Sequence, residues 1–296
     1  MIAFRHSFKA MACVAEIQLY ASDMGTAARV CKAAQREVER IEAKYSRYRD
    51  DSVTAAINRG AGVAPVAIDT ETSALLDYAD ACWEQSEGLF DITSGVLRRV
   101  WDWQRGEPPD PSLIESGVAN IGWQRVRRES LTICLDREME IDFGGIGKEY
   151  AADKAAAVLS QAGISHGLVN LGGDIRAVGA HPGGKPWKIG ITHPRDTTRT
   201  IAHLSLADAG LATSGDYERF FVHRGKRYCH VLNPKTGWPA DGPQSVSVVA
   251  PLCVVAGSCA TIAMLREEGA GDYLREQGYP YLLIDREGNA TGTLAQ

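Results

Sequence analysis

The sequence predicts an α+β fold with a mainly antiparallel sheet and flanking helices, and the order of its segments indicates this class. Segments with helical periodicity concentrate in the first half of the chain, whereas short strand-like runs separated by turn residues follow one another in the second half. This segregation favours an antiparallel sheet over alternating βαβ units. The 296 residues are 45% hydrophobic. We therefore expect residues 1–296 to form a single domain, or two intimately packed subdomains with a cleft between them.

Helical patterns mark five segments. Over residues 24–45, apolar positions that include Val30, Val38 and Ile41 fall on one helical face. A second helix begins after Asp69 or Thr70, either of which can cap it, and ends before residue 88. The remaining helices are predicted over residues 147–162, 254–267 and 271–277.

Strand-like runs occupy most of the remaining chain, and their turns carry Gly, Pro, Asn and Asp. The clearest loop is the proline-rich stretch at 106–111. The predicted strands cover residues 14–19, 167–171, 175–178, 187–192, 201–206, 217–222, 227–232 and 245–249, with a closing hairpin of 281–285 and 290–294.

The bulk composition argues against several classes of function. The 32 basic and 37 acidic residues give a net charge of −5, and no Lys/Arg block marks a track for a phosphodiester backbone, so we expect no nucleic-acid partner. Seven cysteines without a C-x-x-C pair favour reduced thiols over a disulfide framework or a zinc site. Residues 1–13 lack the continuous apolar run of a secretory signal, and no stretch reaches the roughly 20 apolar residues of a membrane span. We therefore expect a soluble, cytoplasmic protein.

Two stretches near the middle of the chain combine glycines with polar side chains. In Phe90-Asp-Ile-Thr-Ser-Gly, an aromatic ring can clamp a planar ligand while Asp91 offers a polar group to its edge. A helix-exit turn capped by Asp91 explains the same residues. In Asp142-Phe-Gly-Gly-Ile-Gly-Lys148, a strand enters two glycines and then a helix, whose N-terminus and lysine can seat a pyrophosphate. A tight strand-to-helix turn is an equally good explanation.

Two later stretches carry further candidate residues. Paired glycines before Asp174 indicate a bulge or the close approach of a ligand or another backbone. His230 stands before a turn rich in hydrogen-bonding groups, where an imidazole can take a proton from an incoming hydroxyl. A structural role for this histidine remains open from the residues alone.

Taken in order, these segments resemble the ApbE family, the FAD:protein FMN transferases. Among the family patterns are Met-Gly-Thr, Asp-Leu-Gly-Gly-Ile-Ala-Lys-Gly, Asn-x-Gly-Gly-Asp, Thr-Ser-Gly-x-Tyr, His-Ile-x-Asp-Pro-x-Thr-Gly-x-Pro and Ala-Asp-x-x-x-Thr. The chain supplies Met11-Ala-Cys, Ser46-Arg-Tyr-Arg-Asp-Asp-Ser52, the four stretches above, Thr213-Ser-Gly-Asp-Tyr, and Ala256-Gly-Ser-Cys-Ala-Thr261. The resemblance extends from Met11 to the final helices, which is nearly the whole chain.

The resemblance implies an ApbE-like, T-fold-like architecture and a specific reaction. Such enzymes bind FAD in an elongated cleft, use a divalent cation, usually Mg²⁺, on its diphosphate, and transfer FMN to a Thr or Ser of an acceptor protein, typically a redox protein, with release of AMP. By matching motif positions, His230 is the expected catalytic base, and the Gly145 carbonyl and Thr261 hydroxyl should face the metal. The residues expected to bind FAD are Met11, Tyr48, Phe90, Asp91, Asp142, Lys148, Asp174 and Thr236.

The main departure from the family is Gly257, which stands where the pattern Ala-Asp-x-x-x-Thr has its metal-ligating aspartate. Losing a carboxylate should weaken a site for a hard cation, so Mg²⁺ binding is in doubt unless Asp142, Asp91 or Ser258 compensates. Two alternatives to the transferase therefore stay open. One is a protein that holds FAD without chemistry, and the other is an FAD pyrophosphatase. Smaller departures are Ala12-Cys13 for Gly-Thr and Asn233 for the usual aspartate.

Overall fold

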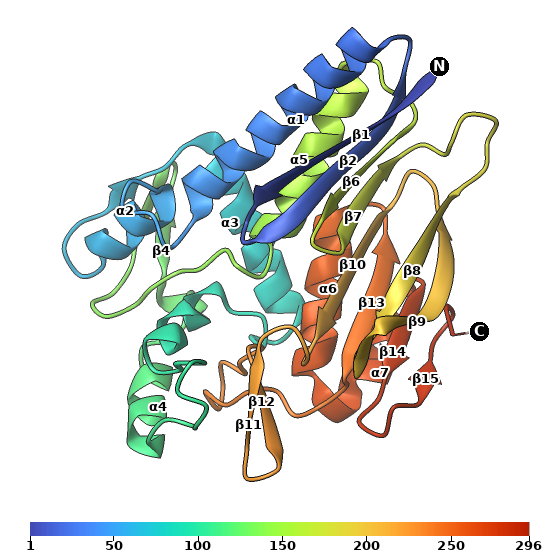
Figure 1. Ribbon diagram of the computed structural model, residues 1–296. Helices are drawn as coiled ribbons and strands as arrows, with labels where there is room; N and C mark the ends of the chain where they lie inside the picture. Colours follow the sequence, from blue (N-terminus) through green and yellow to red (C-terminus); the bar gives the residue numbers. More distant parts are fainter. Residues whose placement is uncertain (296) are drawn as a thin grey trace.

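The computed structural model describes residues 1–295, and its central feature is an eight-stranded sheet (Figure 1). The strands follow the order β1-β2-β6-β7-β10-β13-β14-β15, and all neighbours pair antiparallel. Their bounds are β1 (Ile2–Ala10), β2 (Cys13–Ala21), β6 (Gly167–Leu171), β7 (Asp174–Val178), β10 (Gly210–Gly215), β13 (Ser245–Ala250), β14 (Tyr281–Ile284) and β15 (Ala290–Thr291). The predicted fold class is confirmed.

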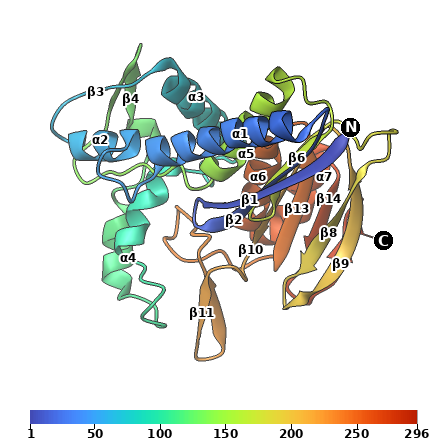
Figure 2. The same ribbon diagram turned by 45° about the horizontal axis from the view of Figure 1, so that its top comes forward.

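Helices cover one face of this sheet and a β-hairpin covers the other (Figures 1 and 2). On the helical side lie α1 (Met24–Tyr45), α5 (Gly147–Gln161), α6 (Cys253–Leu265) and α7 (Ala270–Gln277), which follows the short η3 (Glu267–Gly269). The hairpin consists of β8 (Trp187–His193) and β9 (Asp196–Leu206). Side chains alternate across the strands, so Val169 and Ala212 join the core beneath the helices, whereas Leu168 and Leu211 join a second core beneath the hairpin.

A second group of elements extends from the helical side of the sheet (Figure 1). It contains α2 (Val53–Gly60), α3 (Thr70–Gln85), η1 (Ile92–Arg99), α4 (Pro111–Val118) and η2 (Trp123–Arg125), with a small sheet of β3 (Val66–Ala67), β5 (Thr132–Cys134) and β4 (Arg127–Glu129). The hairpin of β11 (Phe220–His223) and β12 (Lys226–Cys229) projects beside α4 (Figure 2). Phe221 packs there with Leu97, Trp101 and Ile114 in a small aromatic core. This packing ties the loop that follows β12 to the second group of elements.

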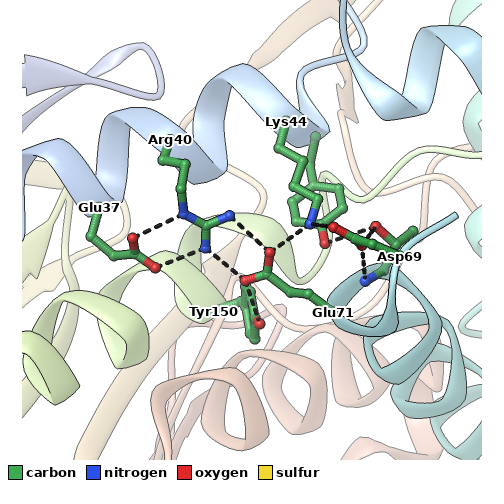
Figure 3. Close-up of polar contacts among 8 residues, drawn as sticks. Glu37, Arg40, Lys44, Asp69, Glu71 and Tyr150 are labelled. Atoms are coloured by element: carbon green, nitrogen blue, oxygen red, sulfur yellow. Dashed lines mark hydrogen bonds and ion pairs between the residues drawn. The ribbon is translucent and has the colours of Figure 1, made fainter.

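A polar network joins α1, α3 and α5 at the base of the helix layer (Figure 3). Glu71 accepts hydrogen bonds from Arg40 at 2.7 Å, from Lys44 at 2.6 Å and from the Tyr150 hydroxyl at 3.1 Å. Lys44 also pairs with Asp69, which caps α3. The hydrogen bond from Arg40 is the main cause that lowers the pKa of Glu71 to about 2. The network therefore fixes three helices relative to one another through one carboxylate.

The sequence located the long elements well and missed short ones. The helix over 24–45 has the predicted bounds, and Asp69 rather than Thr70 caps α3. β1, α2 and β10 were not foreseen, because β1 is an edge strand with charged outward residues, α2 is short, and β10 is built from small and polar residues. The strand predicted over 217–222 is wrong at its start, since β11 begins at Phe220, and the one predicted over 227–232 ends early, at Cys229.

Two expectations from composition also meet the structure. All seven cysteines, which lie within the described residues, are free thiols, and five of them are buried. Within residues 1–295 no helix combines the length and the apolar character that a bilayer crossing requires.

Candidate functional site

A cleft opens where the turn before α5 meets β10, α6, η1 and the segment after β12. Its inner part has a volume of about 180 Å³, and an adjoining outer part has a volume of about 520 Å³. Asp142, Lys148 and His230 line both parts, so the two form one continuous cleft. A third hollow, of about 1020 Å³, lies between the sheet and the β8–β9 hairpin and contains none of the predicted site residues.

The structure brings ten of the eleven predicted site residues to this cleft. The inner part is lined by Phe90, Asp91, Asp142, Gly145, Lys148, Asp174, His230 and Thr261. The outer part adds Met11 and Tyr48. Thr236 is the exception: it lies in the turn at 233–237, where its hydroxyl accepts a hydrogen bond from the backbone N–H of Trp238. Segments separated by more than half of the chain therefore converge in one place.

A buried ion pair forms the floor of the inner cleft. Lys148, in the first turn of α5, lies 2.8 Å from Asp174 at the start of β7. Burial lowers the pKa of Lys148, but the nearby carboxylates of Asp174 and Glu149 outweigh it and leave the pKa raised. Burial also raises the pKa of Asp174, and Lys148 opposes that rise. Because Lys148 remains charged beside the N-terminus of α5, this region presents positive potential to an anion.

The two aspartates predicted to touch the ligand are already bound to protein groups. Asp142 pairs with Arg98 at 2.9 Å and with Arg47 at 3.1 Å, and it accepts the N–H of Gly144. Asp91 accepts the backbone N–H and hydroxyl of Thr93, at 2.8 and 2.6 Å, and the backbone N–H of the next element, η2. The alternative of Asp91 as a cap is therefore observed, at the start of η1.

Close packing explains why the turn before α5 uses glycine. A Cβ added to Gly145 would lie 3.1 Å from Cζ of Phe90, which is tighter than ordinary contact. The Phe90 ring thus lies directly against the backbone of Gly145. In the outer cleft, the Met11 N–H donates to Glu42 at 2.7 Å, while Tyr48 is 78% exposed and free to cover a bound ligand.

His230 is held by its backbone and not by its ring. Its N–H donates to the Arg219 carbonyl at 3.0 Å, whereas ring atom Nδ1 is buried and has no hydrogen-bond partner among the described residues. Burial is the largest cause that lowers the pKa of His230 to about 4, and the charges of Arg98, Arg219 and Lys148 add to it. The imidazole is therefore neutral near pH 7 and can accept a proton.

The α6 end of the cleft contains Gly257, Thr261 and a carboxylate that the sequence did not single out. The Thr261 hydroxyl lies 2.8 Å from the Ser214 hydroxyl on β10. Glu149, in the first turn of α5, also lines the inner cleft, and its Oε2 is buried without a partner. Burial, reinforced by Asp174, raises the pKa of Glu149 to about 8.

None of the three residues expected to compensate for Gly257 has an unused group at this position. Asp142 and Asp91 are engaged as described above. Ser258 is buried and bonded to Tyr78 at 2.6 Å and to the Val254 carbonyl at 2.9 Å, and it is not among the residues that line the cleft. Across residues 1–295 there is no cluster of three or more His, Cys, Asp or Glu side chains suited to a metal. A cation here would therefore need hydroxyl, carbonyl or ligand oxygens besides a carboxylate.

Comparison with known proteins follows this geometry closely. The model of the ApbE family matches residues 11–283. The chain belongs to the ApbE family. The FAD:protein FMN transferase of Treponema pallidum is 33% identical over 78% of this chain and 72% of its own length, and that of Salmonella typhimurium is 27% identical over 96% and 85%.

Solved ApbE structures share the whole fold. The ApbE protein of Thermotoga maritima superposes with a TM-score of 0.91 at 27% identity, covering 100% of both chains. The flavin transferase ApbE of Vibrio cholerae superposes with a TM-score of 0.85 at 25% identity, covering 100% of this chain and 98% of its own. The ApbE-like architecture expected from the motifs is confirmed.

Proposed function

We propose that this ApbE protein transfers FMN from FAD to a Thr or Ser hydroxyl of an acceptor protein and releases AMP. The observation that carries the proposal is the convergence of a cationic helix N-terminus, a neutral unpartnered imidazole and a hydroxyl-lined wall in one cleft. The names of the curated relatives and the family match support the same reaction.

The reaction exchanges one phosphate ester bond for another. The acceptor hydroxyl oxygen attacks the phosphorus of the FMN half, the bond from that phosphorus to the bridging oxygen breaks, and AMP leaves with the bonding electron pair. His230 takes the proton of the hydroxyl as the new bond forms, a contribution of about 10²- to 10⁴-fold in rate for a well-placed base. Its lowered pKa keeps it unprotonated in the empty cleft. A bound diphosphate would offset the surrounding positive charges and make the imidazole more basic.

A divalent cation fits the inner cleft because a buried carboxylate oxygen there lacks any partner. The Gly145 carbonyl, the Thr261 hydroxyl and Glu149 are the protein groups that would hold it, and they are the hard oxygen donors that Mg²⁺ prefers. When bound, the cation supplies neutralisation of charge on the diphosphate. The protein itself positions that diphosphate with Lys148 and the α5 N-terminus and keeps it beside His230.

Product analysis separates this function from its alternatives. The protein is incubated with FAD and Mg²⁺, with and without a panel of Thr- and Ser-containing peptides, and AMP, FMN and covalently bound flavin are quantified. Transfer predicts AMP together with fluorescent peptide, and His230→Gln should reduce the rate by about 10²-fold or more without abolishing FAD binding. AMP and free FMN without acceptor would instead indicate a pyrophosphatase. FAD binding without any product under all conditions would indicate a binding protein and refute the proposal.

A further inference from the structure

Gly257 and Glu149 compete for the same space. A Cβ added at Gly257 would lie 2.6 Å from Cγ, 2.8 Å from Oε1 and 2.9 Å from Cδ of Glu149. Since the carboxyl carbon of an aspartate is one bond beyond its Cβ, an aspartate at 257 would need the volume that the Glu149 carboxylate already fills. The space beside α6 is therefore occupied by a carboxylate that comes from α5.

A second contact one helical turn away fixes this arrangement. Asp153 accepts the backbone N–H groups of Cys253 and Val254, both at 2.9 Å, and so caps the start of α6 from the side of α5. Asp153 follows Glu149 by four residues, and Gly257 follows Cys253 by four, so the two contacts are successive rungs between packed helices. The position of Glu149 against Gly257 thus follows from the register of α5 on α6.

The Glu149 carboxylate has the surroundings of a ligand and not of a structural group. The residue is 8% exposed, its Oε2 has no partner among the described residues, and it shares the inner cleft with Gly145 and Thr261. A buried acidic oxygen without a hydrogen bond is costly, so it is retained where something else binds it. Lys148 does not meet this need, because its ammonium pairs with Asp174.

We propose that Glu149 supplies the carboxylate ligand for the divalent cation in this cleft, delivered from α5 into the space that Gly257 leaves open on α6. The proposal rests on the proposed function, since the cation is the one that accompanies the FAD diphosphate. It accounts for Gly257 as half of an exchange: the carboxylate is kept, and the helix that carries it has changed.

Charge supports a cation at this position. The inner cleft holds Glu149 and Asp174 against one ammonium, Lys148. A diphosphate placed beside two carboxylates and a single lysine meets an excess of negative charge, and a divalent cation bound to Glu149 removes that repulsion. Of the two carboxylates, only Glu149 has an oxygen free to bind it.

The test measures Mn²⁺ binding and not turnover. Free Mn²⁺ is followed by electron paramagnetic resonance in titrations of the full chain with saturating FAD, and FAD affinity is measured separately by flavin fluorescence. Glu149→Gln, which keeps the shape and removes the charge, should weaken Mn²⁺ binding by about 10- to 100-fold. The matched control is Glu218→Gln, which removes a carboxylate from the same cleft wall and should change Mn²⁺ affinity much less.

The exchange itself is tested with two further variants. Gly257→Asp alone should lower the urea midpoint and give no gain in Mn²⁺ affinity, because the new side chain collides with Glu149. Glu149→Gly/Gly257→Asp returns the carboxylate to α6 and should recover most of the affinity that Glu149→Gln loses. This non-additivity does not depend on whether any single variant is destabilised.

The outcomes separate this inference from the proposed function. Equal Mn²⁺ affinity in the wild type and Glu149→Gln would overturn the inference while leaving FAD binding and transfer intact. Absence of FAD binding would overturn the proposed function; Mn²⁺ titration without FAD then still has to show tighter binding by the wild type than by Glu149→Gln. If Glu149→Gln does not fold, failure of the double variant to bind Mn²⁺ overturns the inference.

Discussion

His230 should give the protein a dependence of folding stability on pH that one substitution removes. In the folded protein, burial and the charges of Arg98, Arg219 and Lys148 lower its pKa from 6.5 to about 4. In the unfolded chain the imidazole regains its ordinary pKa. Between these two values the unfolded chain binds one more proton than the folded protein. The stability is therefore fully present above pH 6.5 and is lost as the pH falls through about 4.

The size of this effect follows from the two pKa values. At about 1.4 kcal/mol per pH unit, the whole interval is worth about 3 kcal/mol, and about 2 kcal/mol is lost by pH 5. The assay is urea unfolding near pH 7 and near pH 5, with the wild type compared with His230→Gln. The wild type should lose about 2 kcal/mol more than the variant, since all other titrating groups are common to both.

Two further measurements determine whether the reasoning is right. His203→Gln changes an exposed histidine on β9 and should show the same pH dependence as the wild type. An NMR titration of His230 should move upward when FAD is bound, because a diphosphate offsets the charge of Arg98 and Lys148. Identical pH dependence in the wild type and His230→Gln would show that the imidazole is solvated, and the case for a poised base would fail.

Three other substitutions test the packing around the cleft by urea unfolding. Glu71→Gln breaks the network of Figure 3 and should cost about 1–2 kcal/mol near pH 7. This stabilisation is present above pH 4.5 and is lost as the pH falls toward about 2, so the difference should shrink in acid. Asp153→Ala removes the cap of α6 and should cost about 1–3 kcal/mol. Ala12→Gly should stabilise by up to about 1 kcal/mol, because Ala12 has a φ of 58° in the turn between β1 and β2.

Each of these has a control in the chain. Asp51→Asn breaks an exposed pair with Arg49 and should leave the unfolding midpoint unchanged. Asp153→Asn keeps one acceptor oxygen and should fall between the wild type and Asp153→Ala. Ala15→Gly, at a fully buried position within β2, should destabilise where Ala12→Gly stabilises. Loss of stability in Ala12→Gly would mean that the turn is not strained.

The sequence was sufficient for the fold class and for most of the site because both depend on local patterns. The helix over 24–45 is defined by a face of apolar residues, and α3 by the Asp69 cap. The cleft residues were found through ordered motifs, each placed at the end of a strand or helix. Short elements without a pattern, such as α2 and β10, could not be found in this way, since tertiary packing and not local periodicity holds them.

Glu149 was missed for a different physical reason. Residues 149 and 257 lie on different helices, and periodicity within each helix says nothing of the register between them. Considered alone, Gly257 is a lost ligand and Glu149 is an acidic residue in the first turn of a helix, where it needs no special explanation. Two simultaneous departures from the family patterns, Glu after Lys148 and Gly for the aspartate, were the available signal. Only the packing of α5 on α6 shows that they occupy one space.

The exchange predicts that position 257 must be glycine for as long as residue 149 is glutamate. In the wild type, Gly257→Ala places a Cβ 2.6 Å from Cγ of Glu149 and should destabilise by about 1–3 kcal/mol. In a Glu149→Ala background the obstruction is gone, and the same change should stabilise by up to about 1 kcal/mol, because alanine favours the helix interior over glycine. Urea unfolding of the four proteins measures both values. The sign of the effect should therefore reverse, whereas the same sign in both backgrounds would show that Glu149 does not hold Gly257 in place.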